Sequence, residues 1–255
     1  MIVTASTTPD IDLWSADWHA WRAERIALAT AAHGLAAAIG THWLGDEPIH
    51  INGLPGAWVA VDGRAVGADA DGFRVELEPG RGHVLGALLL QPLIRAGELA
   101  LRVFDPQATT RTGLAGIDAF APDRAWVIEG IAEKTSATLR LDHIDGFVSE
   151  NAASRIHLTV GGRDIAFEGV RTPAGDTQIT FADTTNGTET QRFRFLTVPP
   201  PDHSGRVTVD FNRAYLPPCT FSDHYLCPLP PAPNRLDIPI RAGETWLRYS
   251  DSAPR

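Results

Sequence analysis

Both cysteines of the chain lie in one proline-rich segment, residues 210–236, which reads DFNRAYLPPCTFSDHYLCPLPPAPNRL. A thiolate is a nucleophile and a metal ligand, and two nearby thiols can form a disulfide. Cys219 and Cys227 are eight positions apart, so a curled loop brings them together. Catalysis needs a neighbouring base or cation, such as His224 or Arg213. Buried structural thiols are favoured, and a disulfide, a zinc site with nearby histidines and a nucleophile stay open.

A second polar cluster reads FADTTNGTET and covers residues 181–190. Asp183 and Thr185 can bond neighbouring backbone groups in this turn, which is the favoured structural role. The functional alternative places Asp183 in a pocket with Asn212 and Tyr215. Burial there raises the pKa of a carboxyl toward use as a general base.

These two segments supply all the candidate site residues. The candidate catalytic residues are Asp183, Asp210, Tyr215 and Cys219. The candidate ligand-binding residues are Asn212, Arg213, Thr185, Asn234 and Cys227. The sequence lacks G-x-S-x-G, H-E-x-x-H, the P-loop pattern and a G-x-G-x-x-G after a strand, so we assign no metal ligands and expect no cofactor.

The prolines of residues 210–236 determine how this segment lies. Proline fixes φ and removes a backbone donor, which excludes a helix or a central strand. We therefore expect a rigid extended strap, and we use "the strap" for residues 210–236 below. It either covers the mouth of a β-barrel or forms one wall of a pocket.

One helix is expected near the N-terminus, from Leu13 to about Ala32. Its stripe at helical spacing consists of Trp14, Trp18, Trp21, Arg25 and Leu28. Such a stripe is usually the buried face of an amphipathic helix rather than an aromatic ligand platform. Asp12 is the expected N-cap and Gly34 the expected stop.

Short alternating runs separated by Asp-Gly, Gly-Gly and Asn-Gly turns follow the helix. The expected strands are Ile49–Asn52, Ala57–Val61, Phe73–Glu78, His83–Leu88, Glu98–Phe104, Trp126–Ala132, Ala137–Leu141, Phe147–Glu150, Arg155–Val160, Asp164–Glu168, Thr177–Phe181, Gln191–Val198, Arg206–Phe211, Arg235–Ile240 and Thr245–Leu247. Many strands with little helix between them predict a mostly β fold of antiparallel barrel or sandwich units, with one N-terminal amphipathic helix and the C-terminal strap.

The domain organisation follows from a change in composition. Residues 105–123 are polar and turn-rich, which is typical of a link between two β units. We expect a helix and cap over residues 1–45, a smaller β unit over 46–120 and the main barrel-like domain over 121–255.

The charge restricts the partners. A formal net charge of −9 and a pI near 5.4 lack the basic surface that nucleic acids and acidic membranes require. No apolar run approaches the roughly 20 residues that span a bilayer. The start, MIVTASTTPDIDLW, lacks the pattern of a secretory signal, so a cytoplasmic protein is expected. An unknown small molecule is the expected partner, and a homodimer stays open.

Several motifs resemble a bacterial family of unknown function. They are DFNRAYLPPCTF, CPLPPAPNRL and IRAGE within residues 210–244, with FADTTNGTET, GTHWLG and ALRVFDP upstream. The resemblance covers nearly the whole chain and implies no assigned activity, substrate or cofactor. The sequence departs from the family pattern at Leu216, usually Asn, and at residues 191–193, where a glycine-rich turn is shortened.

Two functions compete. The first is a small-molecule-binding β protein with a cofactor-independent enzymatic site under the strap. The alternative is a non-catalytic binding or interaction module in which the residues of the motifs above, called the signature residues below, are structural. Whether any reaction is catalysed stays open. A structural domain stabilised by a zinc ion is the least favoured of the three hypotheses.

Overall fold

The computed structural model describes residues 9–133 and 135–250. Within them the chain forms two compact units, each considered separately. The large unit contains residues up to 26, 115–220 and 226–248, and the small unit contains 27–114, 221–225 and 249–250. Strands dominate the described chain and one long helix lies near the N-terminus, so the predicted mostly β fold class is confirmed.

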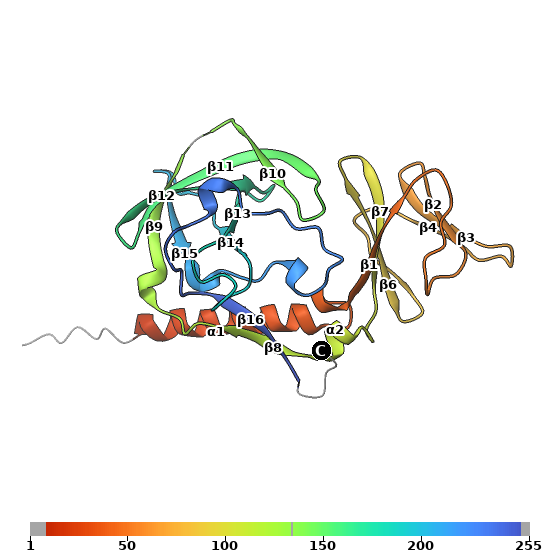
Figure 1. The fold of residues 1–255 in the computed structure, drawn as a ribbon, viewed down its shortest axis with the longest axis horizontal. Coiled ribbons are helices and arrows are strands. Elements are labelled where there is room, and N and C mark those ends of the chain that lie inside the picture. Colours follow the sequence, from red (N-terminus) through yellow and green to blue (C-terminus); the bar gives the residue numbers. More distant parts are fainter. Residues whose placement is uncertain (1–8, 134, 251–255) are drawn as a thin grey trace, which may run out of the picture. The chain divides into compact units, whose positions relative to one another are not determined.

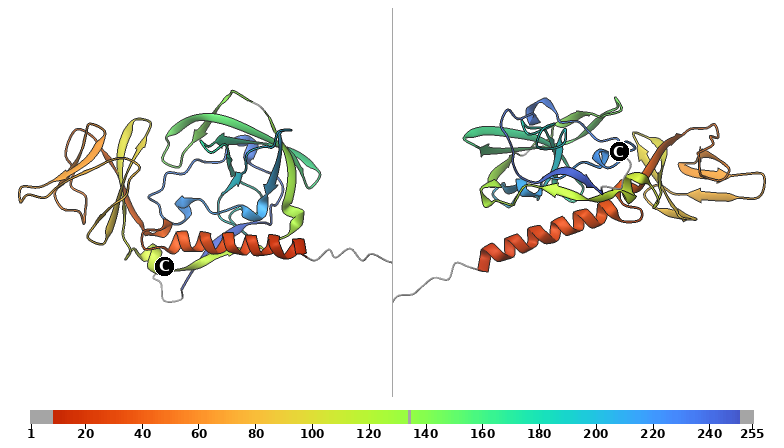
Figure 2. Two further views of the ribbon diagram at one scale, coloured as in Figure 1. Left: turned by 180° about the vertical axis from the view of Figure 1, so that it is seen from behind. Right: turned by 60° about the horizontal axis from the view of Figure 1, so that its bottom comes forward.

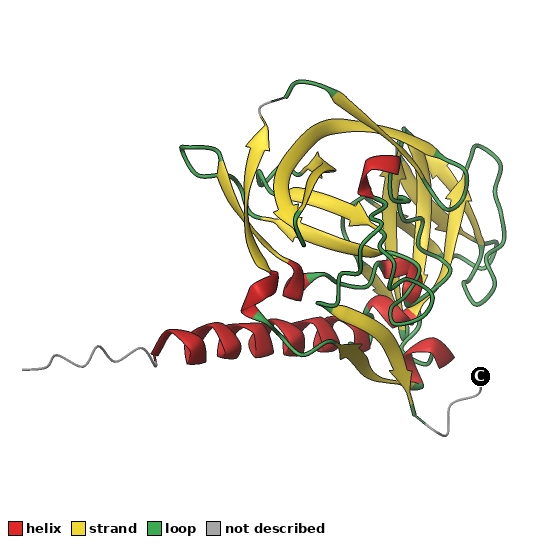
Figure 3. Ribbon diagram, turned by 60° about the vertical axis from the view of Figure 1, so that its left-hand side comes forward, coloured by secondary structure: helices red, strands yellow, loops and turns green. Residues whose placement is uncertain are grey.

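The large unit is built on one curled antiparallel sheet (Figures 1 and 3). Its strands follow the order β14-β13-β12-β11-β9-β15, and β10 pairs with β11. They are β9 (Val127–Glu133), β10 (Thr138–Asp142), β11 (Val148–Val160), β12 (Arg163–Arg171), β13 (Thr177–Phe181), β14 (Arg194–Val198) and β15 (Arg206–Asp210). The two strands predicted at residues 147–150 and 155–160 are one strand, β11, because the intervening residues continue the pairing to β10 and then to β12.

The sheet buries one face in an aromatic and aliphatic core. Phe167, Phe181 and Phe211 contact one another with ring centroids 6.1 Å apart. Ile156 and Leu196 are also fully buried in this core. Since side chains alternate along a strand, the residues between these core positions form the opposite face of the sheet.

One helix and a short strand pair complete the large unit. Helix α1 (Pro9–Thr30) runs along β8 (Leu114–Ala119) and β16 (Glu244–Tyr249) (Figures 1 and 2). The helix begins before Asp12, which is therefore not its N-cap. Leu28 is 54% exposed, whereas Trp18, Arg22 and Ala29 are buried, so the buried stripe runs through Arg22 rather than Leu28.

The small unit contains two antiparallel sheets around Trp58, which is fully buried. One sheet has the order β1-β7-β6-β5 and the other β2-β3-β4. The strands are β1 (Ala38–Leu44), β2 (Ala57–Val61), β3 (Arg64–Ala68), β4 (Arg74–Leu77), β5 (His83–Leu85), β6 (Leu88–Arg95) and β7 (Glu98–Phe104). Gly67 fits β3 because a Cβ at this position would lie 2.7 Å from the Trp58 ring.

Several predicted elements differ from the structure. The strand expected at His83–Leu88 is a hairpin, because Gly86 turns at a φ of 62°. Residues 49–52 and 235–240 form only single bridges, Ile49 to Trp58 and Arg235 to Ala182. Strand β8 lies inside the stretch predicted to be a linker, and β1 and β3 were not predicted.

After Asp210, the last residue of β15, the strap contains short 3₁₀ turns and no strand, as the prolines require. The turns are η3 (Phe211–Arg213), η4 (Pro218–Thr220) and η5 (Ala232–Asn234). None of the helices in the described ranges combines the length and the apolar composition needed to cross a membrane.

Candidate functional site

Asn212 and Asp210 fix the start of the strap. The Asn212 side chain accepts a hydrogen bond from Asp123 N and donates one to Asp123 O, both at 2.9 Å. Asp210 Oδ1 accepts from the Asn212 backbone N at 3.0 Å and from its Nδ2 at 2.8 Å. Trp18 Nε1 donates to Asn212 O at 3.0 Å. Asn212 therefore joins three segments of the large unit, and its amide is fully used.

Asn234 fixes the other end of the strap through its side-chain hydrogen bonds. Its Oδ1 accepts from Glu168 N at 2.8 Å, and its Nδ2 donates to Glu168 O at 2.6 Å and Thr180 O at 2.8 Å. The side chain is fully buried. Asn234 thus replaces a missing strand partner for β12 and β13.

Asp183 lies in a buried ion pair. Its Oδ2 accepts from Arg194 Nη2 at 2.6 Å, and both side chains are 0% exposed. Its Oδ1 accepts from the backbone N and the hydroxyl of Thr185 at 2.8 and 2.6 Å, and from Ile240 N at 3.2 Å. Burial lowers the pKa of Arg194, and the carboxylate opposes that shift. Both Asp183 oxygens are therefore occupied by the chain itself.

The other predicted site residues also contact their own neighbours. Arg213 bonds to Asp17 and stacks over Trp21. The hydroxyl of Tyr215 accepts from Gln178 Nε2 at 2.7 Å. Cys227 is buried, and its Sγ accepts from Cys219 N at 3.3 Å.

The structure thus brings the predicted residues together in small clusters rather than in one pocket. Asp183 meets Thr185, Asp210 meets Asn212, and Cys219 meets Cys227. Across residues 9–133 and 135–250, no three His, Cys, Asp or Glu side chains converge in the manner of metal ligands.

Glu244 is a buried carboxylate of the IRAGE motif that is not among the candidate site residues predicted from the sequence. It is 0% exposed and bonds to Arg22 at 2.9 Å and Arg25 at 3.1 Å. It also accepts from Leu216 N at 2.8 Å. Gly243 precedes it at a φ of 79°, where a Cβ would lie 2.4 Å from Ala214 O. The A-G-E end of the motif therefore connects α1, β16 and the strap.

A pocket lies on the face of the large sheet opposite the core, next to the strap. Its volume is about 440 Å³. It is lined by Leu141, His143, Ser149, Asn151, Val170, Arg171, Thr172, Pro173, Gln178, Phe195 and Pro228. Pro228 belongs to the strap, so the strap forms one wall of this pocket. We call it the strap pocket.

Three polar side chains meet on one side of the strap pocket. His143 Nδ1 lies 2.9 Å from Leu226 O, and His143 Nε2 lies 2.9 Å from Ser149 Oγ. Asn151 Nδ2 donates to the same Ser149 Oγ at 2.9 Å. A carbonyl oxygen only accepts hydrogen bonds, so Nδ1 carries the proton in the neutral ring and Nε2 accepts from the serine hydroxyl.

Local pairing explains why these residues meet. Strands β10 and β11 form a hairpin in which Leu141 is opposite Ser149. The turn is closed by His143 N donating to Phe147 O at 2.8 Å. Ser149 and Asn151 are two residues apart and share a face of β11. Edge-to-face contact with Phe147 at 5.4 Å positions the imidazole.

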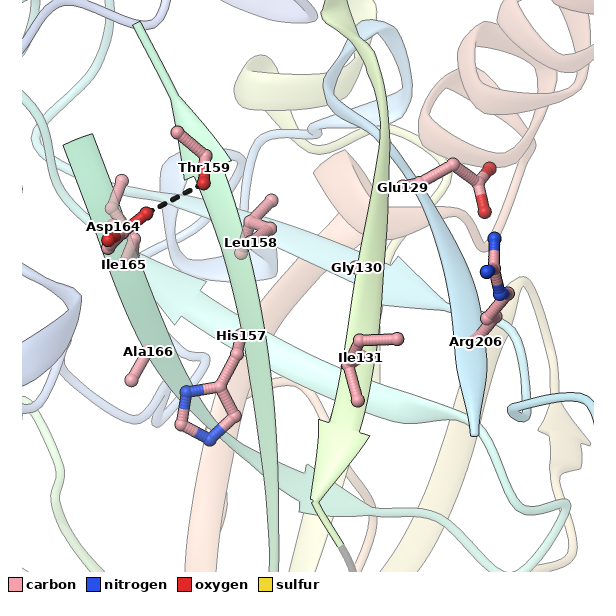
Figure 4. A pocket seen from close by; sticks show the side chains of 10 residues that line it. All are labelled: Glu129, Gly130, Ile131, His157, Leu158, Thr159, Asp164, Ile165, Ala166 and Arg206. Carbon is pink, nitrogen blue, oxygen red and sulfur yellow. Dashed lines mark hydrogen bonds between the residues drawn. The ribbon is translucent and has the colours of Figure 1, made fainter. Parts of the chain in front are cut away.

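A second hollow lies on the exposed strand face around β9, β11, β12 and β15 (Figure 4). Its volume is about 570 Å³. Thr159 donates to Asp164 at 2.7 Å, and Glu129 points toward Arg206 in Figure 4. His157, which also lines it, bonds to Glu133 at 2.9 Å. Glu129 also accepts from Thr208 Oγ1 at 2.9 Å, so carboxylates engage the hydroxyl and imidazole groups around this hollow.

The sequence carries a signal for the strap pocket, although His143, Ser149 and Asn151 are not among the candidate residues named above. An S-x-N pattern on a strand, six residues after a histidine across an Asp-Gly turn, indicates that all three share one side of a hairpin.

Comparisons with known proteins define the family. No curated protein matches the chain. One solved structure that resembles it is the solution NMR structure of an uncharacterized protein from Haloarcula marismortui, with 23% identity and a TM-score of 0.43. The similarity covers 55% of this chain and 78% of that one. Residues 112–245 match the family described as "Protein of unknown function (DUF1684)", which is just over half of the chain. The chain belongs to this family.

Proposed function

We propose that the large unit binds a small, uncharged molecule in the strap pocket. The observation that carries the proposal is the convergence of His143, Ser149 and Asn151 on one side of a pocket whose other lining is largely aliphatic or aromatic. Pockets of this kind bind ligands through apolar surface and orient them through a few polar groups. The ligand therefore has an apolar body and one polar end.

The signature residues of the strap support this pocket from outside it. Asn212 and Asn234 hold the strap by its two ends, and neither lines the pocket. Their position outside the pocket supports a structural role for the signature residues, as in the alternative function. The proposed binding site lies beside them. Tyr215 connects the two, since its hydroxyl accepts from the pocket residue Gln178.

The test uses benzamide, which joins a ring to an amide that both donates and accepts hydrogen bonds. We expect titration of the ¹⁵N-labelled full chain to shift the amide signals of Ser149, Asn151 and Val170. Val170→Trp places an indole in the strap pocket and abolishes these shifts. Ile131→Trp is the matched control, because Ile131 is a 50% exposed strand residue of the second hollow.

Two results would overturn the proposal. One is that benzamide up to its solubility limit shifts no signal of the strap pocket. The other is that Val170→Trp leaves the shifts intact while Ile131→Trp removes them, which would move the site to the second hollow.

Location and assembly remain proposals from the sequence. We propose a cytoplasmic protein. We also propose that it has no nucleic-acid partner, because the acidic charge of −9 opposes a phosphate backbone. A homodimer stays open, and sedimentation equilibrium of the full chain distinguishes it from a monomer.

A further inference from the structure

We propose that Ser149 is an acyl-accepting nucleophile with His143 as its base, so that the strap pocket hydrolyses small carboxylic esters. This inference rests on the proposed binding function and assigns a reaction to the same pocket. It follows from the direction of the hydrogen bonds and from how firmly the imidazole is held.

The imidazole is prepared to take the serine proton. Leu226 O holds the proton on Nδ1 at 2.9 Å, which leaves the Nε2 lone pair directed at Ser149 Oγ, also at 2.9 Å. A nucleophile, a base within hydrogen-bond reach and a third group that orients the base are the arrangement that activates a serine. Here a backbone carbonyl provides the orientation.

The strap fixes that carbonyl. Leu226 lies in the strap, and His143 forms an isolated bridge with Pro228. Leu229 N donates to Asp142 O at 2.7 Å. The strap is therefore hydrogen-bonded to the residue on the N-terminal side of His143, which keeps the ring nitrogen and Leu226 O in register. This gives the proline-rich segment a role in the reaction without placing its cysteines in it.

Asn151 supplies a donor for developing negative charge. Its Nδ2 has two N–H bonds, one of which is donated to Ser149 Oγ at 2.9 Å. Within residues 9–133 and 135–250, no other acceptor is bonded to this nitrogen. A side-chain amide in this position stabilises an oxyanion beside the nucleophile.

The neighbouring histidine on β11 does not have this arrangement. His157 Nε2 bonds to the carboxylate of Glu133 at 2.9 Å, and the nearby hydroxyl of Thr159 donates to Asp164. The carboxylates of Glu133 and Asp164 therefore engage the imidazole and the hydroxyl. His157 therefore serves as an internal comparison for His143.

The reaction balances without a cofactor. Ser149 Oγ attacks the ester carbon, its proton moves to His143 Nε2, and the carbonyl electrons move to oxygen. The C–O bond to the alcohol then breaks, and the alkoxide leaves with the proton from His143. Water repeats the sequence on the acyl-serine, which releases the carboxylic acid and restores the hydroxyl. The largely apolar lining favours a short, uncharged acyl group.

The experiment measures hydrolysis of 4-nitrophenyl acetate by the full chain. We expect Ser149→Ala to lower the rate by about 100-fold or more, because it removes the nucleophile from which His143 takes the proton. Ser204→Ala is the matched control, since Ser204 is an exposed turn hydroxyl in the same unit. The ¹⁵N spectrum of Ser149→Ala shows that the variant is folded if the signals of strands outside the strap pocket match those of the wild type.

Mass spectrometry gives a second readout that does not depend on turnover. Diisopropyl fluorophosphate should form a Ser149 Oγ–P bond as fluoride leaves, and the added mass should map to the peptide containing Ser149. His143→Gln should prevent this labelling. The inference is overturned if Ser149→Ala hydrolyses the ester as fast as the wild type, or if the label maps elsewhere. Benzamide binding without hydrolysis or labelling would reject the reaction alone, and absence of binding would reject the proposed function.

Discussion

At the scale of single residues, the polar side chains of this protein have two different roles. Asp183, Asn212 and Asn234 have their polar atoms occupied by other parts of the chain. Ser149 and Asn151 bond to each other and also line a pocket. Burial with full hydrogen bonding indicates a structural role, because leaving such groups without partners costs stability.

The Asp183–Arg194 pair gives the first residue-scale prediction. We expect Asp183→Asn to lower the free energy of unfolding by about 3–5 kcal/mol, because it leaves a buried guanidinium without its counter-charge. The exposed pair Arg163–Asp237, with side chains 59% and 71% exposed, provides the control. Asp237→Asn should change stability by less than about 1 kcal/mol. Urea unfolding followed by circular dichroism measures both, and equal effects would contradict the structural assignment of Asp183.

At the scale of elements, a buried carboxylate joins helix α1 to β16 and the strap. Glu244 bonds to Arg22 and Arg25 of the helix and to Leu216 N. Burial lowers the pKa of Arg22, and Glu244 opposes that shift. Three elements distant in sequence therefore meet at one side chain.

Glu244→Gln tests this connection. The change keeps the shape of the side chain and removes its charge, so we expect faster hydrogen exchange across the second half of α1. Glu189→Gln is the control, because Glu189 forms an exposed pair with Arg241 at 2.8 Å. Protection of α1 that is unchanged in Glu244→Gln would contradict a role of this carboxylate in holding the helix.

The contact between β9 and β11 gives a pH prediction. The hydrogen bond from His157 is the main cause that lowers the pKa of Glu133, and Arg155 adds to it. A carboxyl with a lowered folded-state pKa stabilises the protein above its unfolded-state pKa, near 4.5, and loses that contribution as the pH falls through the folded value. Wild type should therefore exceed Glu133→Gln in urea midpoint at pH 7 and match it near pH 3. A difference that persists at pH 3 would contradict this.

At the scale of the whole molecule, the pattern of turns and alternating residues was enough to predict the fold class. Proline chemistry also predicted a strap without regular strands. Strand β8 could not be predicted, because its LAGIDA sequence lies in a polar, turn-rich stretch and is ordered by pairing with β16. The small unit's β3 depends on Gly67 meeting Trp58, a contact that no local pattern reveals.

Long-range contacts also determine the candidate site, and the sequence does not reveal them. The strap motif predicts residues that could do chemistry, but in the structure these residues form hydrogen bonds within the chain. The strap pocket depends on the β10–β11 pairing and on Leu226 O reaching His143 across 83 positions. Sequence spacing predicts the hairpin, whereas the long-range contact that orients the imidazole requires the folded chain.

The central claim is that the strap pocket is where this protein meets a small molecule. A crystal structure of the full chain soaked with benzamide tests it most directly. We expect the amide to bond to Ser149, Asn151 and His143, with the ring against Val170 and Pro228. Benzamide bound in the hollow of Figure 4, with the strap pocket closed by its own side chains, would contradict the account.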